Sequence, residues 1–201
     1  MLGLVCLIVA YLLGGIPFGL LLAKWKTGQD VRQMGSGNIG ATNVMRTAGT
    51  ATGVVTLLLD VAKGYMAVWL ASQWPGTDVW LMSSAAAAVM LGHAFPPYLR
   101  FQGGKSVATF VGAFLFLAPL PVLAALIVFA VTVAASRFVS LGSVLGAATF
   151  PLAVWLIQHP PAPVLLAAIF GGAFVVWRHK TNIERLRAGT EHVLRLRGAN
   201  R

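Results

Sequence analysis

Acidic side chains and cysteine are scarce in this sequence. Its 201 residues include five Asp and Glu residues and one cysteine, Cys6. A lone cysteine excludes an intrachain disulfide and any metal site built from cysteines. Charged residues make up only 10% of the chain, whereas 58% are hydrophobic and the mean hydropathy is +0.80. No soluble globular domain needs that much apolar surface, so we predict an integral membrane protein.

The first apolar segment, residues 2–23, contains no charged side chain. At about 1.5 Å per residue it is long enough to cross a hydrocarbon core about 30 Å thick. It lacks a basic start and a small-residue cleavage site, so we interpret it as a retained span rather than a signal peptide. Further apolar segments lie at residues 50–74, 79–98, 107–135, 139–157 and 163–177.

Basic residues in the loops decide how often the long segment 107–135 crosses. The net charge is +10, and basic residues favour the cytoplasmic side of a membrane. A single crossing divides the loop basic residues six against eight, whereas a turn at Pro119 and Pro121 puts all fourteen on one side and leaves Lys63 inside a span. Because proline is a natural break, we predict an all-α membrane protein with seven transmembrane segments, an outside N-terminus and a cytoplasmic C-terminus. We expect residues 1–201 to form one membrane-embedded domain.

A polar, glycine-rich segment at residues 35–46 interrupts the apolar chain. Its glycines match the dinucleotide pattern G-x-G-x-x-G, but that motif needs a strand before the glycines, and here a transmembrane segment and a polar loop precede them. Gly104, Lys105 and Ser106 imitate the end of a P-loop, yet Leu99 stands where the first glycine of that motif is required. Neither nucleotide site is therefore predicted.

The same glycines can form a cradle for a phosphate group. Glycine permits positive φ and close backbone approach, so successive N–H groups can converge on phosphate oxygens. Neutral hydrogen-bonding side chains and one arginine accompany them. The candidate cradle residues are Gly35, Ser36, Gly37, Asn38, Gly40, Thr42, Asn43 and Arg46. The alternative is a glycine-rich turn in which Ser, Thr and Asn cap the next helix.

Two further polar blocks accompany this loop. Residues 92–109 read GHAFPPYLRFQGGKSVAT, and residues 179–191 read HKTNIERLRAGTE. In order, spacing and topology the three blocks resemble the bacterial acyl-phosphate-dependent glycerol-3-phosphate acyltransferases, and the resemblance spans most of the chain. One departure is Ser106, where the family's Gly-Gly-Lys block usually continues with glycine.

The resemblance implies transfer of a fatty acyl group from acyl phosphate to the 1-hydroxyl of glycerol 3-phosphate. The products are 1-acyl-sn-glycerol 3-phosphate and inorganic phosphate, and the reaction is the first acylation of phospholipid synthesis. The expected catalytic residues are Ser36, Arg46, Lys105, His179 and Asn182. The expected substrate contacts are Gly35, Gly37, Asn38, Gly40, Thr42, Asn43, Gly103, Gly104, Ser143 and Glu191. In this scheme the cradle and Lys105 hold the donor phosphate, whereas Arg46, His179 and Asn182 bind glycerol 3-phosphate.

No cofactor is expected, and the sequence leaves open whether a protein base takes part. No histidine has an aspartate five positions away, and the nucleophile elbow G-x-S-x-G does not occur. An acyl phosphate is a mixed anhydride that is already activated, so strong base catalysis is less necessary. We expect positioning and charge stabilisation to carry most of the catalysis, and the acceptor's own phosphate could receive the proton. We expect no metal and no nucleic acid, and the expected partners are the two substrates and the phospholipid bilayer. The chain is expected to act as a monomer in the bacterial inner membrane, with its active site on the cytoplasmic face.

Asp60 and Lys63 are charged residues inside a predicted span. A charge at the centre of a span costs about 2.5 to 3.5 kcal/mol, so these side chains should face the bundle interior or each other. They could form a structural ion pair or help to shape the site. A transporter or lipid-binding protein that recognises a phosphate-bearing substrate without chemistry would also use such residues. The sequence shows no inverted repeat and its polar motifs converge on one face, which favours an enzyme.

Overall fold

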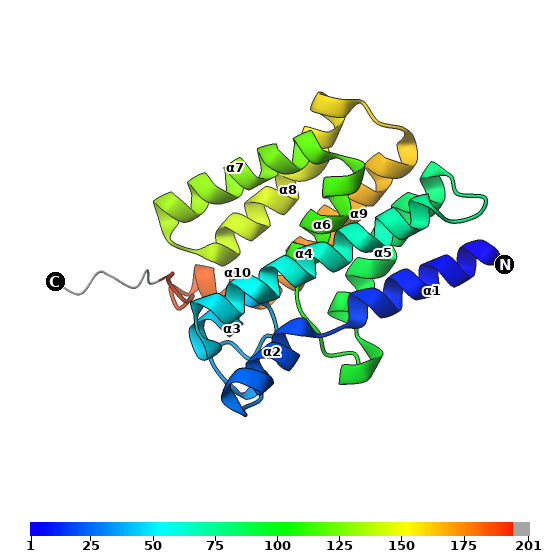
Figure 1. Ribbon diagram of the computed structural model, residues 1–201. Helices are drawn as coiled ribbons and strands as arrows, with labels where there is room; N and C mark the ends of the chain where they lie inside the picture. The colour runs from blue at the N-terminus through cyan, green and yellow to red at the C-terminus, as the bar shows by residue number, and fades with distance from the viewer. Residues whose placement is uncertain (195–201) are drawn as a thin grey trace. The chain divides into compact units, whose positions relative to one another are not determined.

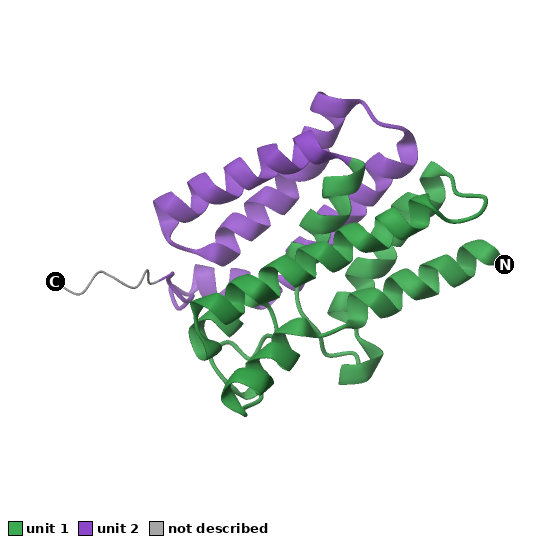
Figure 2. Cartoon of the chain, viewed as in Figure 1, with its two compact units in different colours: residues 1–117 green, residues 118–201 purple. Residues whose placement is uncertain are grey.

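The chain is all-helical, with no strand in the part that the structure describes. The structure is a computed structural model that describes residues 1–194 (Figure 1). The chain divides into two compact units, Met1–Leu117 and Ala118–Arg201 (Figure 2). Of the basic tail residues used for the predicted topology, Arg195, Arg197 and Arg201 lie outside the described residues.

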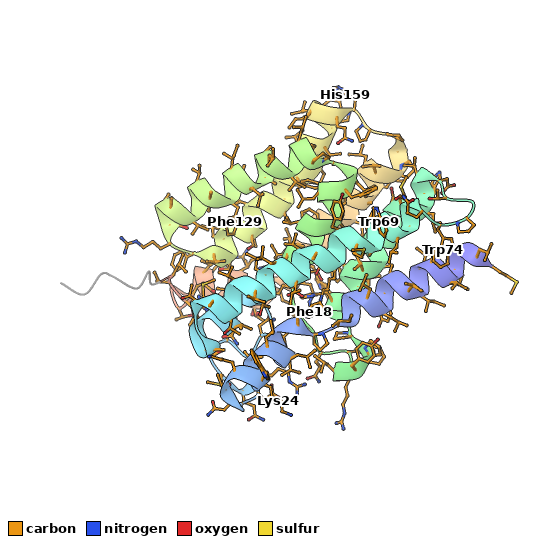
Figure 3. The ribbon with its side chains drawn as sticks, viewed as in Figure 1. Phe18, Lys24, Trp69, Trp74, Phe129 and His159 are labelled. Atoms are coloured by element: carbon orange, nitrogen blue, oxygen red, sulfur yellow. The ribbon has the colours of Figure 1, made fainter. Side chains whose placement is uncertain are left out.

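Unit 1 is built around its longest helix, α4. Its elements in chain order are α1 (Leu2–Gly15), α2 (Phe18–Thr27), η1 (Val31–Gln33), α3 (Ala41–Ala48), α4 (Thr50–Ser72), α5 (Val79–Ala94), η2 (Pro97–Leu99) and α6 (Val107–Leu117). Helix α4 packs against α1, α2, α3, α5 and α6. Figure 3 labels Phe18, at which α2 begins, and Trp74, which lies beside the start of α1. The indole N–H of Trp74 donates to the Leu2 carbonyl over 2.9 Å.

The first apolar segment is two helices rather than one. Proline has no N–H to donate and disfavours a helical conformation in the residue before it. Ile16, which precedes Pro17, is accordingly extended, with φ −62° and ψ 116°. At the break the carbonyl of Ile16 accepts from the Phe18 N–H over 3.1 Å instead of from a regular helical partner, and a buried side chain described below adds a second donor.

Glycines allow the helices of unit 1 to approach closely. A Cβ at Gly14 of α1 would overlap the Val89 carbonyl of α5, and a Cβ at Gly64 of α4 would overlap the Thr109 carbonyl of α6. Gly112 of α6 meets the backbone of α4 in the same way. Small residues at such crossings let membrane helices pack backbone against backbone, so even the 11-residue α6 is held firmly against α4.

Unit 2 contains four helices within residues 118–194. They are α7 (Pro119–Ser136), α8 (Val139–Gln158), α9 (Ala162–Arg178) and α10 (Lys180–Arg187). Helix α8 packs against α7, α9 and α10. The chain bends by 53° between α9 and α10, at His179. Helices α6 and α7 are separate, so the apolar segment 107–135 is broken as predicted. The break lies at Ala118, and Pro119 and Pro121, where the turn was expected, belong to the first turn of α7, where proline is tolerated.

Five helical segments of the described chain are long and apolar enough to cross a membrane. They are Leu2–Thr27, Thr50–Ser72, Val79–Leu99, Pro119–Ser136 and Val139–Gln158. The bent pair α9 and α10 makes a sixth when it counts as one span, whereas α6 is apolar but shorter. The protein is therefore an integral membrane protein with five to six candidate spans by length and composition.

Candidate functional site

Asn43 organises the glycine-rich loop from inside. Its side chain is 2% exposed, and its Oδ1 accepts a 2.9 Å hydrogen bond from the Ser36 N–H. Its Nδ2 lies 2.9 to 3.1 Å from the carbonyl oxygens of Val31, Met34 and Asn38. Asn43 was expected to touch substrate. In the structure these polar contacts go to the loop backbone, which supports a role in shaping the loop.

Two glycines of the loop adopt conformations that require glycine. Gly35 has φ +57° and Gly37 has φ +70°. At Gly35 a Cβ would also overlap the side chain of Asn43. The Asn38 carboxamide accepts a 2.8 Å hydrogen bond from the Gly40 N–H, which closes the turn into α3. The sequence therefore folds residues 35–40 into a tight backbone coil that ends at the N-terminus of α3.

The side chains around this coil include the arginine expected to bind an anion. Ser36 and Thr42 are half-buried, whereas Arg46 is exposed in the last turn of α3. The first turn of a helix carries partial positive charge, so an anion beside Thr42 is stabilised. The backbone N–H groups of Ser36, Gly37 and Gly40 donate within the loop, so they do not converge on a phosphate as the cradle hypothesis expected. The candidates for substrate contact are therefore the loop's polar side chains.

The block 92–109 forms a second loop at the same end of unit 1. Leu99 packs against the buried cluster of Leu20, Ala23, Val31, Ile39 and Val44, which supports the glycine-rich loop. After η2 the chain folds back on α5, because the N–H groups of Gly103 and Gly104 donate to the carbonyls of Ala94 and His93, each over 3.0 Å.

The two glycines of this loop lie directly against the end of α5. A Cβ at Gly103 would overlap the His93 carbonyl, and a Cβ at Gly104 would overlap the His93 ring. The half-buried Lys105 follows at once. Ser106 then takes φ +62°, the left-handed conformation that favours glycine, and its buried hydroxyl donates to the Met90 carbonyl over 2.8 Å. The family's glycine at this position is explained by that φ, and the hydrogen bond explains how serine is accommodated.

Asp60 and Lys63 face each other, as predicted. Lys63 Nζ lies 2.8 Å from Asp60 Oδ1, and the two residues are 3% and 2% exposed. Lys63 also donates a 2.8 Å hydrogen bond to the carbonyl of Ile16 at the α1–α2 break. His93 Nδ1 lies 3.7 Å from the same Asp60 oxygen. Sequence reasoning missed His93 as a member of this cluster, because two residues 33 positions apart meet only through the packing of α4 on α5.

The block 179–191 forms the polar end of unit 2. His179 is 3% exposed, and its Nδ1 donates to the Val175 carbonyl over 2.7 Å. A carbonyl can only accept, so Nδ1 carries the proton of this hydrogen bond. Asn182 Nδ2 donates to Glu191 Oε1 over 2.9 Å.

Glu191 is held by two neighbours in the same block. Its second oxygen accepts a 2.9 Å hydrogen bond from Arg185 Nε. Burial on its own raises the pKa of the Glu191 carboxyl, but the hydrogen bonds from Arg185 and Asn182 outweigh it and lower that pKa. A carboxylate so engaged orients Asn182, and Arg185 is a partner that the sequence did not single out. Ser143 is buried, and its hydroxyl donates to the Val139 carbonyl of its own helix over 2.9 Å.

Of the expected catalytic residues, unit 1 thus carries Ser36 on the glycine-rich loop, Arg46 on α3 and Lys105 on the loop after η2. His179 and Asn182 lie at the polar end of unit 2. Within residues 1–194 no three His, Cys, Asp or Glu side chains are grouped so as to hold a metal ion.

The three polar blocks, up to Gly189 in the last of them, lie within a stretch that matches a known protein family. A sequence model of the family described as "Glycerol-3-phosphate acyltransferase" matches residues 4–189. The chain belongs to the glycerol-3-phosphate acyltransferase family. The glycerol-3-phosphate acyltransferase of Desulforamulus reducens is 49% identical to this chain over 186 residues, which cover 92% of each chain. The glycerol-3-phosphate acyltransferase of Geotalea daltonii is 47% identical over 192 residues, which cover 96% of this chain and 97% of the relative.

Solved structures of the same family share the fold. The crystal structure of PlsY (YgiH), an integral membrane glycerol 3-phosphate acyltransferase, in its glycerol 3-phosphate form has a TM-score of 0.90 and 39% identity, and the match covers 96% of each chain. The lysophosphatidic acid form has a TM-score of 0.87 and 37% identity, covering 96% of this chain and 95% of that one. This glycerol-3-phosphate acyltransferase family member therefore carries the three polar blocks on a fold shared with PlsY.

Proposed function

We propose that this protein transfers a fatty acyl group from acyl phosphate to the 1-hydroxyl of glycerol 3-phosphate. The products are 1-acyl-sn-glycerol 3-phosphate, which is a lysophosphatidic acid, and inorganic phosphate. The observation that carries the proposal is the similarity, over 96% of the chain, to a PlsY that was crystallised in a glycerol 3-phosphate form and in a lysophosphatidic acid form. Those ligands are the acceptor and the product of one acyl transfer.

The proposed step is direct attack on an activated carbonyl. The acceptor oxygen forms a bond to the acyl carbon, the bond between that carbon and the phosphate oxygen breaks, and phosphate leaves with the electron pair. The hydroxyl proton passes to the phosphate of glycerol 3-phosphate, so no protein base is required. Donors placed where negative charge develops supply most of the acceleration, as in other acyl transfers.

The residues take roles that match their chemistry. The glycine-rich loop, which Asn43 shapes from inside, and Lys105 hold the donor phosphate and stabilise the leaving charge. Gly103 and Gly104 contribute by setting the backbone that leads to Lys105, since their N–H groups donate to the end of α5. Arg46, His179 and Asn182 bind glycerol 3-phosphate, with Ser143 and Glu191 supporting them. His179 suits this role because the bond from Nδ1 to a backbone carbonyl fixes the orientation of its buried ring. Arg46 suits it because a guanidinium presents a planar fork to a phosphate.

The proposed setting is the inner membrane of a bacterium. Seven transmembrane segments, with the N-terminus outside and the C-terminus in the cytoplasm, place the basic loops on the side where the water-soluble acceptor occurs. The five to six long candidate spans and the separate apolar helix α6 are compatible with seven segments. We propose further that the chain acts as a monomer and as one functional domain.

The experiment is a reconstituted assay. The full-length protein, purified in detergent, is incubated with palmitoyl phosphate and glycerol 3-phosphate, and phosphate release and lysophosphatidate are measured. We expect phosphate release that depends on the acceptor and matches lysophosphatidate formation one to one. Palmitoyl-coenzyme A as the alternative donor should give at most a small fraction of that rate.

Two outcomes would contradict the proposal. Binding of both substrates without turnover, by protein whose folding is verified, would favour a transporter or lipid-binding protein. Equal turnover with palmitoyl-coenzyme A would remove acyl phosphate as the specific donor.

A further inference from the structure

Three ionisable side chains are buried among the apolar helices of unit 1 behind the Lys105 loop. Asp60 and Lys63 come from α4, and His93 comes from the end of α5. Their exposed fractions are 2%, 3% and 5%. None of the three has a role in the proposed reaction. Charged groups inside a membrane protein are costly and usually serve a function, so their contacts are informative.

One side of this cluster holds the broken first span. Lys63 Nζ donates to the Ile16 carbonyl over 2.8 Å and lies 5.6 Å from the centre of the Phe18 ring. The lysine therefore contacts both residues that flank Pro17. It adds a second donor to a carbonyl that lacks a regular helical partner and otherwise accepts from the Phe18 N–H.

The other side of the cluster holds the Lys105 loop. His93 Nδ1 faces Asp60 Oδ1 at 3.7 Å, and the opposite edge of the ring, at Nε2, is where a Cβ at Gly104 would overlap it. The backbone of His93 adds a second contact, because its carbonyl accepts from the Gly104 N–H over 3.0 Å. The position of His93 therefore decides where Gly104, and the next residue Lys105, can lie.

We propose that Asp60, Lys63 and His93 form a positioning cluster that sets the backbone of residues 103–105 and so aims Lys105 at the substrate phosphate. The role of Lys105 in this statement rests on the proposed acyl transfer, whereas the ordering of the loop does not. Asp60 lies beside the His93 ring at 3.7 Å, outside hydrogen-bond distance, so it limits the position of the ring by packing and charge. The ring and carbonyl of His93 seat Gly104, and Lys63 ties Asp60 to the α1–α2 break.

A purely stabilising ion pair is the competing explanation, and it predicts different behaviour. Replacing a buried ion pair by neutral side chains of similar size is often neutral for stability, because desolvation of the two charges offsets their attraction. A positioning cluster loses its effect on the loop in the same replacement. The double variant Asp60→Asn with Lys63→Met therefore separates the explanations, since it leaves no lone buried charge.

The loop is observed with a nitroxide probe in the full-length protein. Cys6 is the only cysteine, so Cys6→Ala with Gln102→Cys gives one labelling site at an exposed residue beside Gly103. The electron paramagnetic resonance spectrum is recorded for the parent, for Asp60→Asn/Lys63→Met, for His93→Ala and for His93→Asn. Asn retains an amide N–H near the place of His Nδ1. Val68→Ala is the matched control, because Val68 is fully buried in α4 within a different cluster.

We expect the probe to become more mobile in the double variant and in His93→Ala, to regain order in His93→Asn, and to be unchanged in Val68→Ala. In the unlabelled protein, Asp60→Asn/Lys63→Met should lower kcat/KM at least tenfold relative to the parent. Added to the Lys105→Ala variant, the same two substitutions should lower kcat/KM less than threefold relative to Lys105→Ala alone. Such non-additivity marks residues that act through one another.

The proposal is overturned by unchanged spectra in the double variant and in His93→Ala, or by a tenfold loss that persists undiminished in Lys105→Ala. If the double variant does not fold, the comparison of His93→Ala with His93→Asn still decides between the explanations. An inactive parent would contradict the acyl transfer alone, because the spectra still report whether the cluster orders the loop.

Discussion

The side-chain carbonyl of Asn43 accepts a 2.9 Å hydrogen bond from the backbone N–H of Ser36, seven residues earlier in the chain. The amide nitrogen of the same side chain faces three backbone carbonyls of the loop. One buried carboxamide therefore sets the shape of the loop that presents Ser36. Local side-chain bonds of this kind replace regular secondary structure where a loop must keep a fixed form.

Asn43→Asp should disable the loop while leaving the helices folded. The substitution puts an oxygen where Nδ2 faces three carbonyl oxygens, so attraction becomes repulsion. We expect the active loop conformation to lose about 2 kcal/mol or more of free energy, as when a buried polar group is left unsatisfied. In kcat/KM this corresponds to a fall of at least about 30-fold. Steady-state kinetics and limited proteolysis of the loop are the measurements. Thr47→Ala, which removes only a bond to the helix backbone, is the control, and kcat/KM within threefold of the parent in Asn43→Asp would contradict the assignment.

Arg46→Ala should lower kcat/KM by roughly 30- to 1000-fold, which corresponds to the loss of about 2 to 4 kcal/mol of transition-state stabilisation from one preorganised donor. The matched control is Arg32→Ala in η1, just before the glycine-rich loop. Arg32 is bonded to Asp30, with Nη2 to Oδ2 at 2.6 Å, and hydrogen bonds from Arg32 lower the pKa of the Asp30 carboxyl. Its loss should change kcat/KM less than threefold. Equal effects of the two substitutions would point to general positive charge instead of a specific contact.

Ser106→Gly and Ser106→Ala should differ in stability. Glycine relieves the strain of φ +62° and loses the hydroxyl bond to Met90, so the two effects nearly cancel. Alanine keeps the strain and loses the bond, which costs about 1 to 2 kcal/mol. Thermal unfolding in detergent should therefore rank glycine close to the parent and alanine clearly below both. The reverse order would show that the left-handed conformation at residue 106 is not what favours glycine there.

The Glu191 network predicts a pH-dependent stability. The pKa of Glu191 is lowered in the folded protein, so its stabilising contribution is complete above the usual glutamate pKa of about 4.3 and is lost as the pH falls below it. The Tm difference between the parent and Glu191→Gln should be widest near pH 7 and close as the solution is acidified. Glu184→Gln, which removes an exposed carboxylate from α10, should change Tm little at pH 7. A difference between parent and Glu191→Gln that is constant across pH would contradict the charged network.

Several features of the fold could be predicted because they depend on local chemistry. The break between α6 and α7 follows from Pro119, and the membrane setting follows from long apolar runs. The burial and pairing of Asp60 with Lys63 follow from their spacing on one helical face and from the cost of exposing charge to lipid. The break within the first apolar segment is equally local, since Pro17 causes it, but an uncharged run conceals it in a hydropathy reading.

The roles of single polar side chains were less accessible. Asn43 and Glu191 read as substrate contacts because they stand in blocks that resemble a family of phosphate-binding enzymes. In the structure Asn43 bonds the backbone of its own loop and Glu191 bonds Asn182 and Arg185, through partners that lie 5 to 12 residues away in the chain. Their contact with substrate stays a prediction. Composition cannot distinguish a carboxamide that faces a ligand from one that faces backbone, because the same hydrogen-bonding groups serve both purposes.

The sequence by itself determined that this is a helical membrane protein of the glycerol-3-phosphate acyltransferase family, since hydropathy and three polar blocks are properties of the chain order. Only the tertiary structure decided that His93 stands between Asp60 and Gly104, and that Lys63 reaches back to the carbonyl of Ile16. Those contacts join residues far apart in the chain, and they arise from glycine-mediated close packing of α1, α4, α5 and α6, which no local pattern encodes.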